Sequence, residues 1–105
     1  VDEGDLYEIV GNLVDNAAKY GGGRIRIATA RRAGRLELRV EDDGPGIAPA
    51  RRAAVFGRGL RPDADEAADG QGLGLAIVRE RVRAYGGSVE VAASELGGAA
   101  FLVRL

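Results

Sequence analysis

The stretch DLYEIVGNLVDNAAKYGGG, residues 5–23, decides the fold because it combines a helical pattern with a sharp stop. Its apolar residues recur every three or four positions, which predicts one buried face on a helix that runs to about Tyr20. These apolar residues are Leu6, Ile9, Val10, Leu13, Val14 and Ala17. Asp5 is a suitable N-cap for this helix, and the three glycines at residues 21–23 end it.

The residues that follow predict a β-hairpin. Apolar and polar side chains alternate over residues 24–30 and again over residues 36–40, and Ala33 and Gly34 lie between the two runs. This pattern is typical of two antiparallel strands joined by a tight turn. After a turn cluster at residues 42–47, a short helix is expected around residues 49–55.

The second half of the chain repeats the order of helix and strands. Residues 57–70 are polar and aperiodic, which predicts a mobile loop, and a second helix is expected over roughly residues 72–85. Residues 88–92 and 99–105 predict two more strands. The predicted fold is therefore an α+β two-layer sandwich, with helices on one face of a mixed, largely antiparallel sheet.

The composition limits the function. A chain of 105 residues fits one domain, and its formal net charge of -1 favours neither nucleic acid nor an anionic membrane as a partner. It contains no cysteine, so disulfides and cysteine metal sites are excluded, and no histidine, the commonest general base. No apolar run reaches the roughly 20 residues that span a bilayer, and residues 1–4 do not resemble a signal peptide. We therefore expect no direct contact of these residues with a membrane.

The first helix also has a polar face, which contains Glu8, Asn12, Asn16 and Lys19. Asparagine is a poor helix former, so two of them one turn apart favour a functional role over a stabilising one. Their amide oxygens suit Mg²⁺ that also binds waters and phosphate oxygens. The alternative interpretation is an ordinary solvated helix face.

Three glycine clusters are typical of sites where a ligand approaches the backbone. Residues 42–47 (DDGPGI) place a carboxylate at the end of a strand, although an ordinary turn has the same composition. Residues 70–75 (GQGLGL) enter a helix, and the free N–H groups of a helix N-terminus can bind phosphate. Residues 56–59 (FGRG) open the aperiodic loop, and the alternative there is a simple surface loop. Neither a Walker loop nor a dinucleotide-binding fingerprint fits these clusters.

Taken together, these segments resemble the catalytic domain of two-component sensor histidine kinases. Residues 12–20 resemble the N box of that family, residues 42–46 its G1 box, residues 56–59 its F box and residues 70–75 its G2 box. The order and spacing of these boxes match those of the family, and the resemblance covers nearly the whole chain. Within the family, residues 40–47 and 70–72 most resemble the PhoQ-type sensor kinases. The resemblance implies the Bergerat sandwich of Hsp90, gyrase B and MutL, the GHKL superfamily, and it implies binding of ATP and Mg²⁺ and a cytoplasmic location.

The resemblance also implies roles for individual residues. Asn12 and Asn16 would hold Mg²⁺, Lys19 and Arg58 would contact phosphate, and Tyr20 would pack against the nucleotide. Asn12, Lys19 and Arg58 form the expected catalytic set. Asp42 would accept a hydrogen bond from the adenine amino group, Gly46 would give the ring room, and Gln71 would join the metal shell. Gly72 and Gly74 would let a lid close over the triphosphate. The remaining residues of the boxes expected at the nucleotide are Gly44, Ile47, Phe56, Gly70, Leu73 and Leu75.

One position favours phosphoryl transfer over hydrolysis. Hydrolytic members of the superfamily resemble one another in having a glutamate where this chain has Asn12, and an amide cannot take a proton from water. The acceptor histidine would lie on a separate dimerisation domain, with a response regulator downstream. Glu8 remains open as an alternative base. An anti-sigma-factor serine kinase, or a nucleotide-binding interaction module without transfer activity, are the alternative functions.

The resemblance has one departure near the start of the chain. Domains of this family have a helix and further strands before the N box, whereas only residues 1–4 precede the first helix here. We therefore expect an N-terminally trimmed version of the fold, with part of the sheet uncovered.

Overall fold

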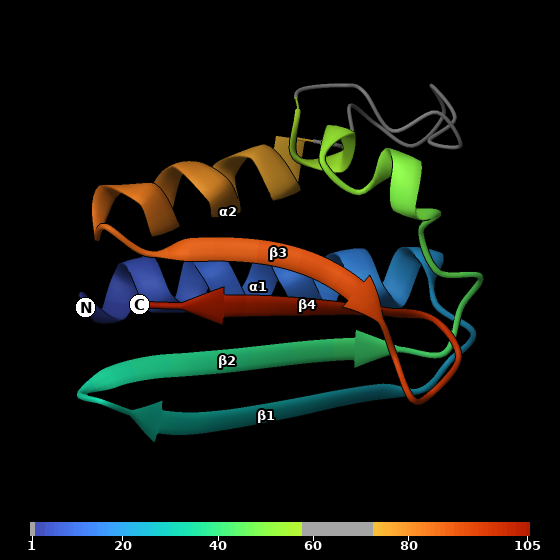
Figure 1. The fold of residues 1–105 in the computed structure, drawn as a ribbon, viewed down its shortest axis with the longest axis horizontal. Helices are drawn as coiled ribbons and strands as arrows, with labels where there is room; N and C mark the ends of the chain where they lie inside the picture. Colours follow the sequence, from blue (N-terminus) through green and yellow to red (C-terminus); the bar gives the residue numbers. More distant parts are fainter. Residues whose placement is uncertain (1, 58–72) are drawn as a thin grey trace.

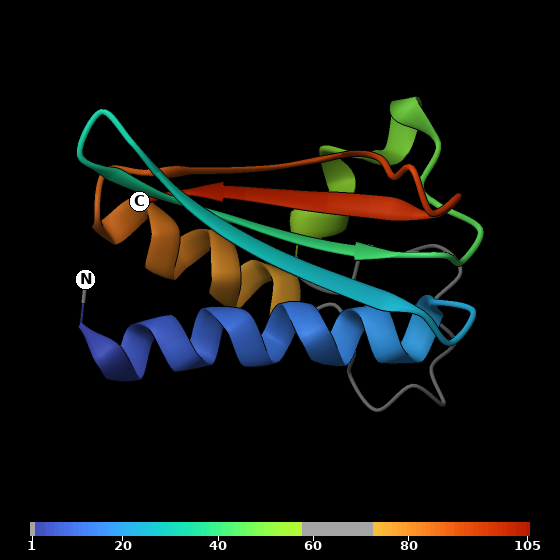
Figure 2. The same ribbon diagram turned by 90° about the horizontal axis from the view of Figure 1, so that it is seen from below.

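A helical layer packs against one face of a β-sheet in the computed structural model of the chain, which describes residues 2–57 and 73–105 (Figure 1). Figure 2 shows both helices on the same side of the sheet. In chain order the elements are α1 (Glu3–Tyr20), β1 (Ile25–Arg32), β2 (Arg35–Asp42), the 3₁₀ turns η1 (Pro49–Arg51) and η2 (Ala54–Phe56), α2 (Leu73–Ala84), β3 (Ser88–Ala93) and β4 (Ala99–Arg104). The predicted α+β sandwich is confirmed.

The sheet has the strand order β1-β2-β4-β3, and each pairing among the described residues is antiparallel. The chain leaves the sheet after β2, passes through α2, and returns at the opposite edge as β3. β4 then fills the place between β3 and β2. This route puts the end of β2 next to the β3–β4 turn, although about 50 residues separate them in the sequence.

The start of α1 corrects one prediction, because Asp2 and not Asp5 is the N-cap. The Asp2 side chain accepts a hydrogen bond from the Gly4 N–H at 2.7 Å, and the Asp2 carbonyl accepts from Leu6 N–H. Asp5 lies in the first helical turn, where its carboxylate accepts from the hydroxyl of Tyr85. Both acids suit a helix N-terminus, and the helix begins at Glu3, three residues earlier than a cap at Asp5 would require.

The predicted hairpin forms around a two-residue turn. Arg32 pairs with Arg35, and the two residues between them, Ala33 and Gly34, have φ values of 53° and 78°. Two consecutive positive φ values are characteristic of a type I′ turn, whose twist matches that of the strands. Ala33 carries the strain of this conformation, since an L side chain is disfavoured there.

The core lies between the two layers and is mainly aliphatic, as the composition predicts. Helix α1 contributes its buried face, and β2, β4 and α2 face it. One aromatic pair reinforces the core, with Phe56 and Phe101 edge-to-face at a centroid distance of 6.1 Å. The most buried members are Ile9, Leu13, Val40, Val78, Val82, Phe101 and Val103, each at most 1% exposed.

Two further segments compare differently with their predictions. Instead of a short helix around residues 49–55, the chain makes two separate 3₁₀ turns, η1 and η2. The stop of α2 is as predicted, since Gly86 has φ 72° and Gly87 N–H donates to the Val82 carbonyl. The loop predicted over residues 57–70 lies, apart from Gly57, outside the described residues.

Candidate functional site

The two helices run antiparallel and are offset, which leaves part of α1 beyond the start of α2. Tyr85 contacts Asp5, Arg81 contacts Glu8, and Gly74 lies against Asn12. Helix α2 begins at Leu73, so the turns of α1 after Asn12 extend past it (Figure 1). Of the polar residues singled out by the sequence, Asn16 and Lys19 are on this extending part, Asn12 is at its beginning, and Glu8 lies before it.

Asn12 is held with its amide oxygen toward the start of α2. Its Nδ2 donates to the Glu8 carbonyl at 2.9 Å, which turns Oδ1 away from that bond. A Cβ on Gly74 would lie 3.1 Å from Asn12 Oδ1, so the absence of a side chain at Gly74 keeps the two helices close here. A neutral carbonyl oxygen beside the N-terminal turn of a helix fits a ligand of Mg²⁺ that also binds phosphate.

Two small hollows of about 30 Å³ and 10 Å³ lie next to each other along this end of the molecule, and together we call them the groove. The lining of the first is Asn12, Asp15, Asn16, Lys19, Tyr20, Gly74 and Leu75. The lining of the second is Asn16, Tyr20, Asp42, Pro45, Gly46, Ile47 and Ala99. Because Asn16 and Tyr20 line both, the groove runs from the amide pair on α1 to the carboxylate at the end of β2. The predicted residues of the N and G1 boxes therefore come together.

Asp42 is a buried carboxylate held in place by backbone N–H groups. It is 4% exposed, and its Oδ1 accepts from Gly44 N–H at 2.9 Å and from Ala99 N–H at 3.3 Å. Its backbone carbonyl accepts from Gly98 N–H at 3.1 Å. Both of these side-chain bonds end on Oδ1, and the Asp42 residue lines the second hollow.

The glycines around Asp42 are required by close backbone packing. A Cβ on Gly98 would lie 2.2 Å from Asp42 Oδ1, and a Cβ on Gly44 would lie 2.3 Å from the Tyr20 carbonyl. Real side chains do not tolerate such distances. Gly46 differs, because its φ of 75° is the constraint and its nearest neighbour, the Gly98 carbonyl, would be 3.4 Å from a Cβ. Gly44 thus joins the end of α1 to the end of β2.

The neighbouring Asp43 has a structural role in the turn between α1 and β1. Its Oδ1 accepts from Gly22 N–H at 2.9 Å and from Arg24 N–H at 3.0 Å, so it fixes the glycine turn between α1 and β1. The hydrogen bond from Arg24 N–H is the main cause that lowers the pKa of Asp43. Of the two adjacent acids, only Asp42 lines the groove.

Other predicted site residues have mixed placements. Phe56 and Leu75 are core residues, 5% and 2% exposed. The Phe56 ring anchors the segment after η1, and Leu75, in the first turn of α2, also lines the first hollow. Ile47 packs against the edge of the core and also lines the groove. The backbone of Leu73 begins α2. The remaining predicted residues lie outside the described part of the chain: Arg58, Gly70, Gln71 and Gly72.

The comparison with known families agrees with this geometry. All of residues 1–105 match the family described as histidine kinase-, DNA gyrase B-, and HSP90-like ATPase. The chain belongs to this family. The family and the sensor-kinase type expected from the sequence are both confirmed by the relatives.

The curated relatives of this ATPase-family chain are sensor kinases. It is 45% identical over 104 residues to the sensor protein kinase CarS of Pseudomonas aeruginosa, covering 99% of this chain and 23% of CarS. It is 43% identical over 98 residues to the virulence sensor histidine kinase PhoQ of Salmonella typhimurium, covering 93% of this chain and 20% of that protein. The chain therefore spans about a quarter or less of the length of these relatives.

Solved structures show the same fold. The mycobacterial sensor histidine kinase MprB superposes with a TM-score of 0.84 at 38% identity, covering all of this chain and 72% of that one. Full-length ShkA, crystallised in complex with AMPPNP, gives a TM-score of 0.83 at 38% identity, covering 99% of this chain and 22% of that one. Over the described residues of this ATPase-family chain, no helix has the length and apolar character needed to cross a bilayer.

Glu8, the alternative base, is engaged by the scaffold of the family fold. Its Oε1 accepts from Arg81 Nε at 2.7 Å, and both side chains are about 40% exposed. This bond raises the pKa of Arg81 further above its ordinary value. Because this carboxylate oxygen is already engaged by Arg81, the geometry does not favour Glu8 as the base that would position a water.

A larger hollow of about 330 Å³ lies on the opposite face of the sheet, away from the helices. Its charged side chains pair with one another, for example Arg26 with Glu41 at 2.9 Å and Arg32 with Glu37 at 3.1 Å. These four charged side chains are thus already paired within the sheet. The groove beside α1 remains the better candidate for a nucleotide.

Sequence analysis missed several residues that the groove uses. Asp15, Pro45 and Ala99 line it, and Gly98 and Ala99 hold Asp42. The only sequence signal for the last two is the glycine pair at the β3–β4 turn. That signal does not identify which strand end the turn meets.

Proposed function

We propose that the chain is the ATP-binding catalytic domain of a sensor histidine kinase. It binds Mg²⁺·ATP in the groove between α1, the end of β2 and the start of α2. It then transfers the γ-phosphoryl group to a histidine on a separate dimerisation domain. The observation that carries the proposal is the continuous groove, with an amide pair and Lys19 at one end and the buried carboxylate of Asp42 at the other.

The adenine end of the groove depends on Asp42. The Asp42 carboxylate lines the groove and is fixed by backbone N–H groups, and it accepts a hydrogen bond from the exocyclic amino group of adenine. Guanine has a carbonyl oxygen at that position, so two acceptors would face each other and the buried charge would lose its partner. Gly46 and Ile47 form the adjacent wall, and Tyr20 packs beside the base.

The phosphate end depends on α1 and the start of α2. Asn12 and Asn16 supply neutral oxygens for Mg²⁺, with Gln71 as a further ligand, and Lys19 and Arg58 neutralise phosphate charge. The metal supplies electrostatic stabilisation of the charge on the transferring phosphoryl group. The free N–H groups of the first turn of α2, near Gly74, provide a further anion site.

Transfer to a histidine is favoured over hydrolysis. The side chain facing the phosphate end of the groove is Asn12, an amide without basic character. Glu8, one turn earlier, is bonded to Arg81. Phosphoryl transfer depends on positioning and charge neutralisation, which the residues of the groove provide without a base for water.

The partners follow from the reaction. They are a histidine-bearing dimerisation domain of the same kinase and a downstream response regulator, and the reaction takes place in the cytoplasm. We propose no nucleic-acid partner and no direct contact of this domain with the membrane.

The test is a radiolabelled ATP assay with and without the histidine-bearing domain of the same kinase. We expect label on the partner that is acid-labile and alkali-stable, as phosphohistidine is. We also expect only slow phosphate release by the chain alone. Fast release by the chain alone, abolished by Glu8→Gln, would overturn the kinase assignment in favour of a hydrolytic ATPase.

A further inference from the structure

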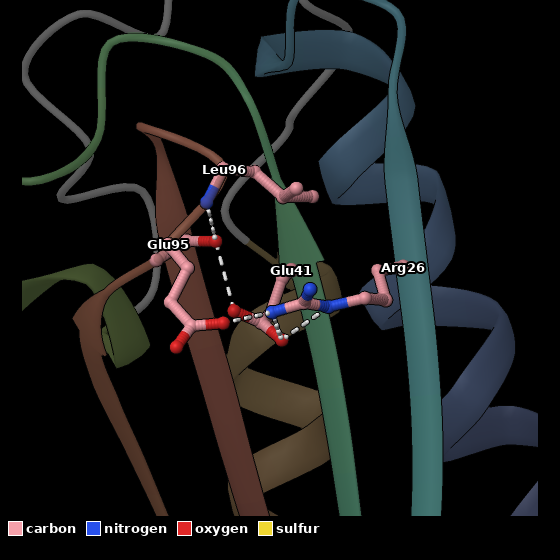
Figure 3. A network of polar contacts seen from close by, with 5 residues as sticks. Arg26, Glu41, Glu95 and Leu96 are labelled. Carbon is pink, nitrogen blue, oxygen red and sulfur yellow. Dashed lines mark hydrogen bonds and ion pairs between the residues drawn. The ribbon is translucent and has the colours of Figure 1, made fainter.

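Strand β2 ends in two adjacent acids that point to opposite faces of the sheet. Asp42 faces the nucleotide groove, while Glu41 faces the side without helices and is nevertheless only 2% exposed. Glu41 Oε2 accepts from Arg26 Nε at 3.0 Å and Nη2 at 2.9 Å, and Glu41 Oε1 accepts from the Ser94 hydroxyl at 2.8 Å. Figure 3 shows the Arg26 guanidinium bonded to the carboxylates of both Glu41 and Glu95. The proposed nucleotide site makes no use of this network.

The network holds the turn between β3 and β4. Ser94 Oγ donates to Glu41 and accepts from Leu96 N–H at 2.9 Å, as the dashed lines in Figure 3 show. The Ser94 backbone closes the turn, because its N–H donates to the Gly98 carbonyl at 2.9 Å and its carbonyl accepts from Gly97 N–H at 3.0 Å. One serine thus connects the outer carboxylate of β2 to the whole turn.

The same turn supplies the groups that hold Asp42 on the other face. Gly98 N–H donates to the Asp42 backbone carbonyl at 3.1 Å, and Ala99 N–H donates to its Oδ1 at 3.3 Å. The packing leaves little freedom, since a Cβ on Gly98 would lie 2.2 Å from Asp42 Oδ1. A displacement of the turn must therefore change the orientation of the Asp42 carboxylate.

The buried charge of Glu41 is compensated by its hydrogen-bond partners Arg26 and Ser94. Burial raises its pKa, but the hydrogen bonds from Ser94 and Arg26, together with the charge of Arg26, outweigh burial and lower the pKa below its ordinary value. Arg39 on the same strand adds to the lowering, and Glu95 pairs with the outer side of Arg26 at 3.0 Å. Glu41 is thus ionised at neutral pH and is a strong acceptor for the Ser94 hydroxyl.

We infer that Ser94 and Glu41 are positioning residues for the adenine site. From the opposite face of the sheet they set the place of the β3–β4 turn and, through Gly98 and Ala99, the orientation of the Asp42 carboxylate. This inference rests on the proposed function for its effect on nucleotide binding. Neither residue touches the nucleotide, and both act through the turn.

The decisive variant is Ser94→Ala, with Ser94→Thr as the conservative variant and Ser88→Ala on β3 as the matched control. We expect Ser94→Ala to weaken binding of Mg²⁺·ADP by about fivefold, the equivalent of one hydrogen bond. Affinity for Mg²⁺·triphosphate, which has no base, should not change. Ser94→Thr keeps the hydroxyl and should restore most of the affinity for ADP, and Glu41→Gln should act like Ser94→Ala.

A second measurement separates this inference from the proposed function. Amide hydrogen exchange at Gly98 and Ala99 should accelerate in Ser94→Ala and stay as in the parent chain in Ser88→Ala, with or without nucleotide. Unchanged exchange at both amides, or equal losses of ADP and triphosphate affinity, would overturn the positioning role. Failure of the parent chain to bind ADP would instead count against the proposed function, and the exchange rates would still decide the role of Ser94.

Discussion

Both ends of the helix pair carry polar side chains of α1, but these side chains are bonded to α2 at one end and line the groove at the other. At one end, the acids of α1 are bonded by α2, with Glu8 held by Arg81 and Asp5 by Tyr85. The β1–β2 turn lies at this same end (Figure 1). At the other end, α1 extends past the start of α2, and Asn12, with the polar residues that follow, borders a groove. We call these the closed end and the open end.

The difference shows how one helix can be both scaffold and site. The bonds between polar groups of the two helices fix the register of α1 against α2. The residues further along α1 therefore have a defined position relative to the end of β2. At the other end of the groove, the backbone N–H groups of Gly44, after β2, and Ala99, after the β3–β4 turn, hold Asp42. We expect changes at the open end to alter ligand affinity, and changes at the closed end to alter stability alone.

The largest expected effect at the open end is that of Asp42→Asn. The amide would present an N–H₂ group to the adenine amino group, so two donors would face each other. We expect a loss in ADP affinity of about 1.5–3 kcal/mol, or roughly 10- to 150-fold, measured by calorimetry. Asp43→Asn is the matched control, because Asp43 serves the glycine turn beside β1, and it should leave ADP affinity close to that of the parent chain. Equal losses in both variants would contradict the assignment.

The next effect separates the two ends along α1 itself. Asn16→Ala should remove the part of ADP affinity that depends on Mg²⁺, roughly 5- to 10-fold by the value of one ordinary hydrogen bond. Titrations with and without EDTA measure this part. Glu8→Gln, two turns earlier at the closed end, should keep the metal dependence and the slow phosphate release unchanged. Metal dependence that survives Asn16→Ala would remove the metal role from this residue.

Acid should loosen the open end through Glu41. Its pKa is lower in the folded chain than in the unfolded chain, so the unfolded state binds more protons on acidification. The stability from Glu41 is complete above its unfolded pKa of about 4.3, and it is lost as the pH falls through the lower folded pKa. Urea unfolding between pH 6 and pH 2 should show a weaker pH dependence for Glu41→Gln than for the parent chain. The same slope in both would mean that Glu41 contributes nothing.

The smallest effect is expected at the closed end, in the β1–β2 turn. Ala33 has φ 53°, which asparagine tolerates better than alanine. Ala33→Asn should therefore stabilise the chain by about 0.5–1 kcal/mol in urea unfolding without changing ADP affinity. Gly34→Ala, at φ 78°, should destabilise it. A gain in stability that also changed ADP affinity would break the separation between the two ends.

Local patterns predicted most of this architecture. The spacing of apolar residues in α1 and the alternation in β1 and β2 placed the helix and the hairpin correctly, because burial of a face imposes those periods on the sequence. The motif resemblance also brought together Asn12, Asn16 and Asp42, which the structure places along one groove.

What the sequence did not predict depends on contacts between distant residues. Tyr85 bonds both the carboxylate of Asp5 and the backbone N–H of the cap residue Asp2, and the buried Glu41 bonds Ser94, 53 positions later. Composition alone also did not show that Phe56 would pack against Phe101. Each of these outcomes requires the order β1-β2-β4-β3, which no local pattern in the sequence encodes.

The most direct test of the separation between the two ends is a map of backbone amide NMR shifts on addition of Mg²⁺·ADP. The account predicts the largest shifts at Asn16, Gly44, Gly74 and Ala99 around the groove. It predicts unchanged shifts at Arg81 and Tyr85 and in the β1–β2 turn. Shifts centred on the closed end, or on the charged hollow of the opposite sheet face, would contradict it.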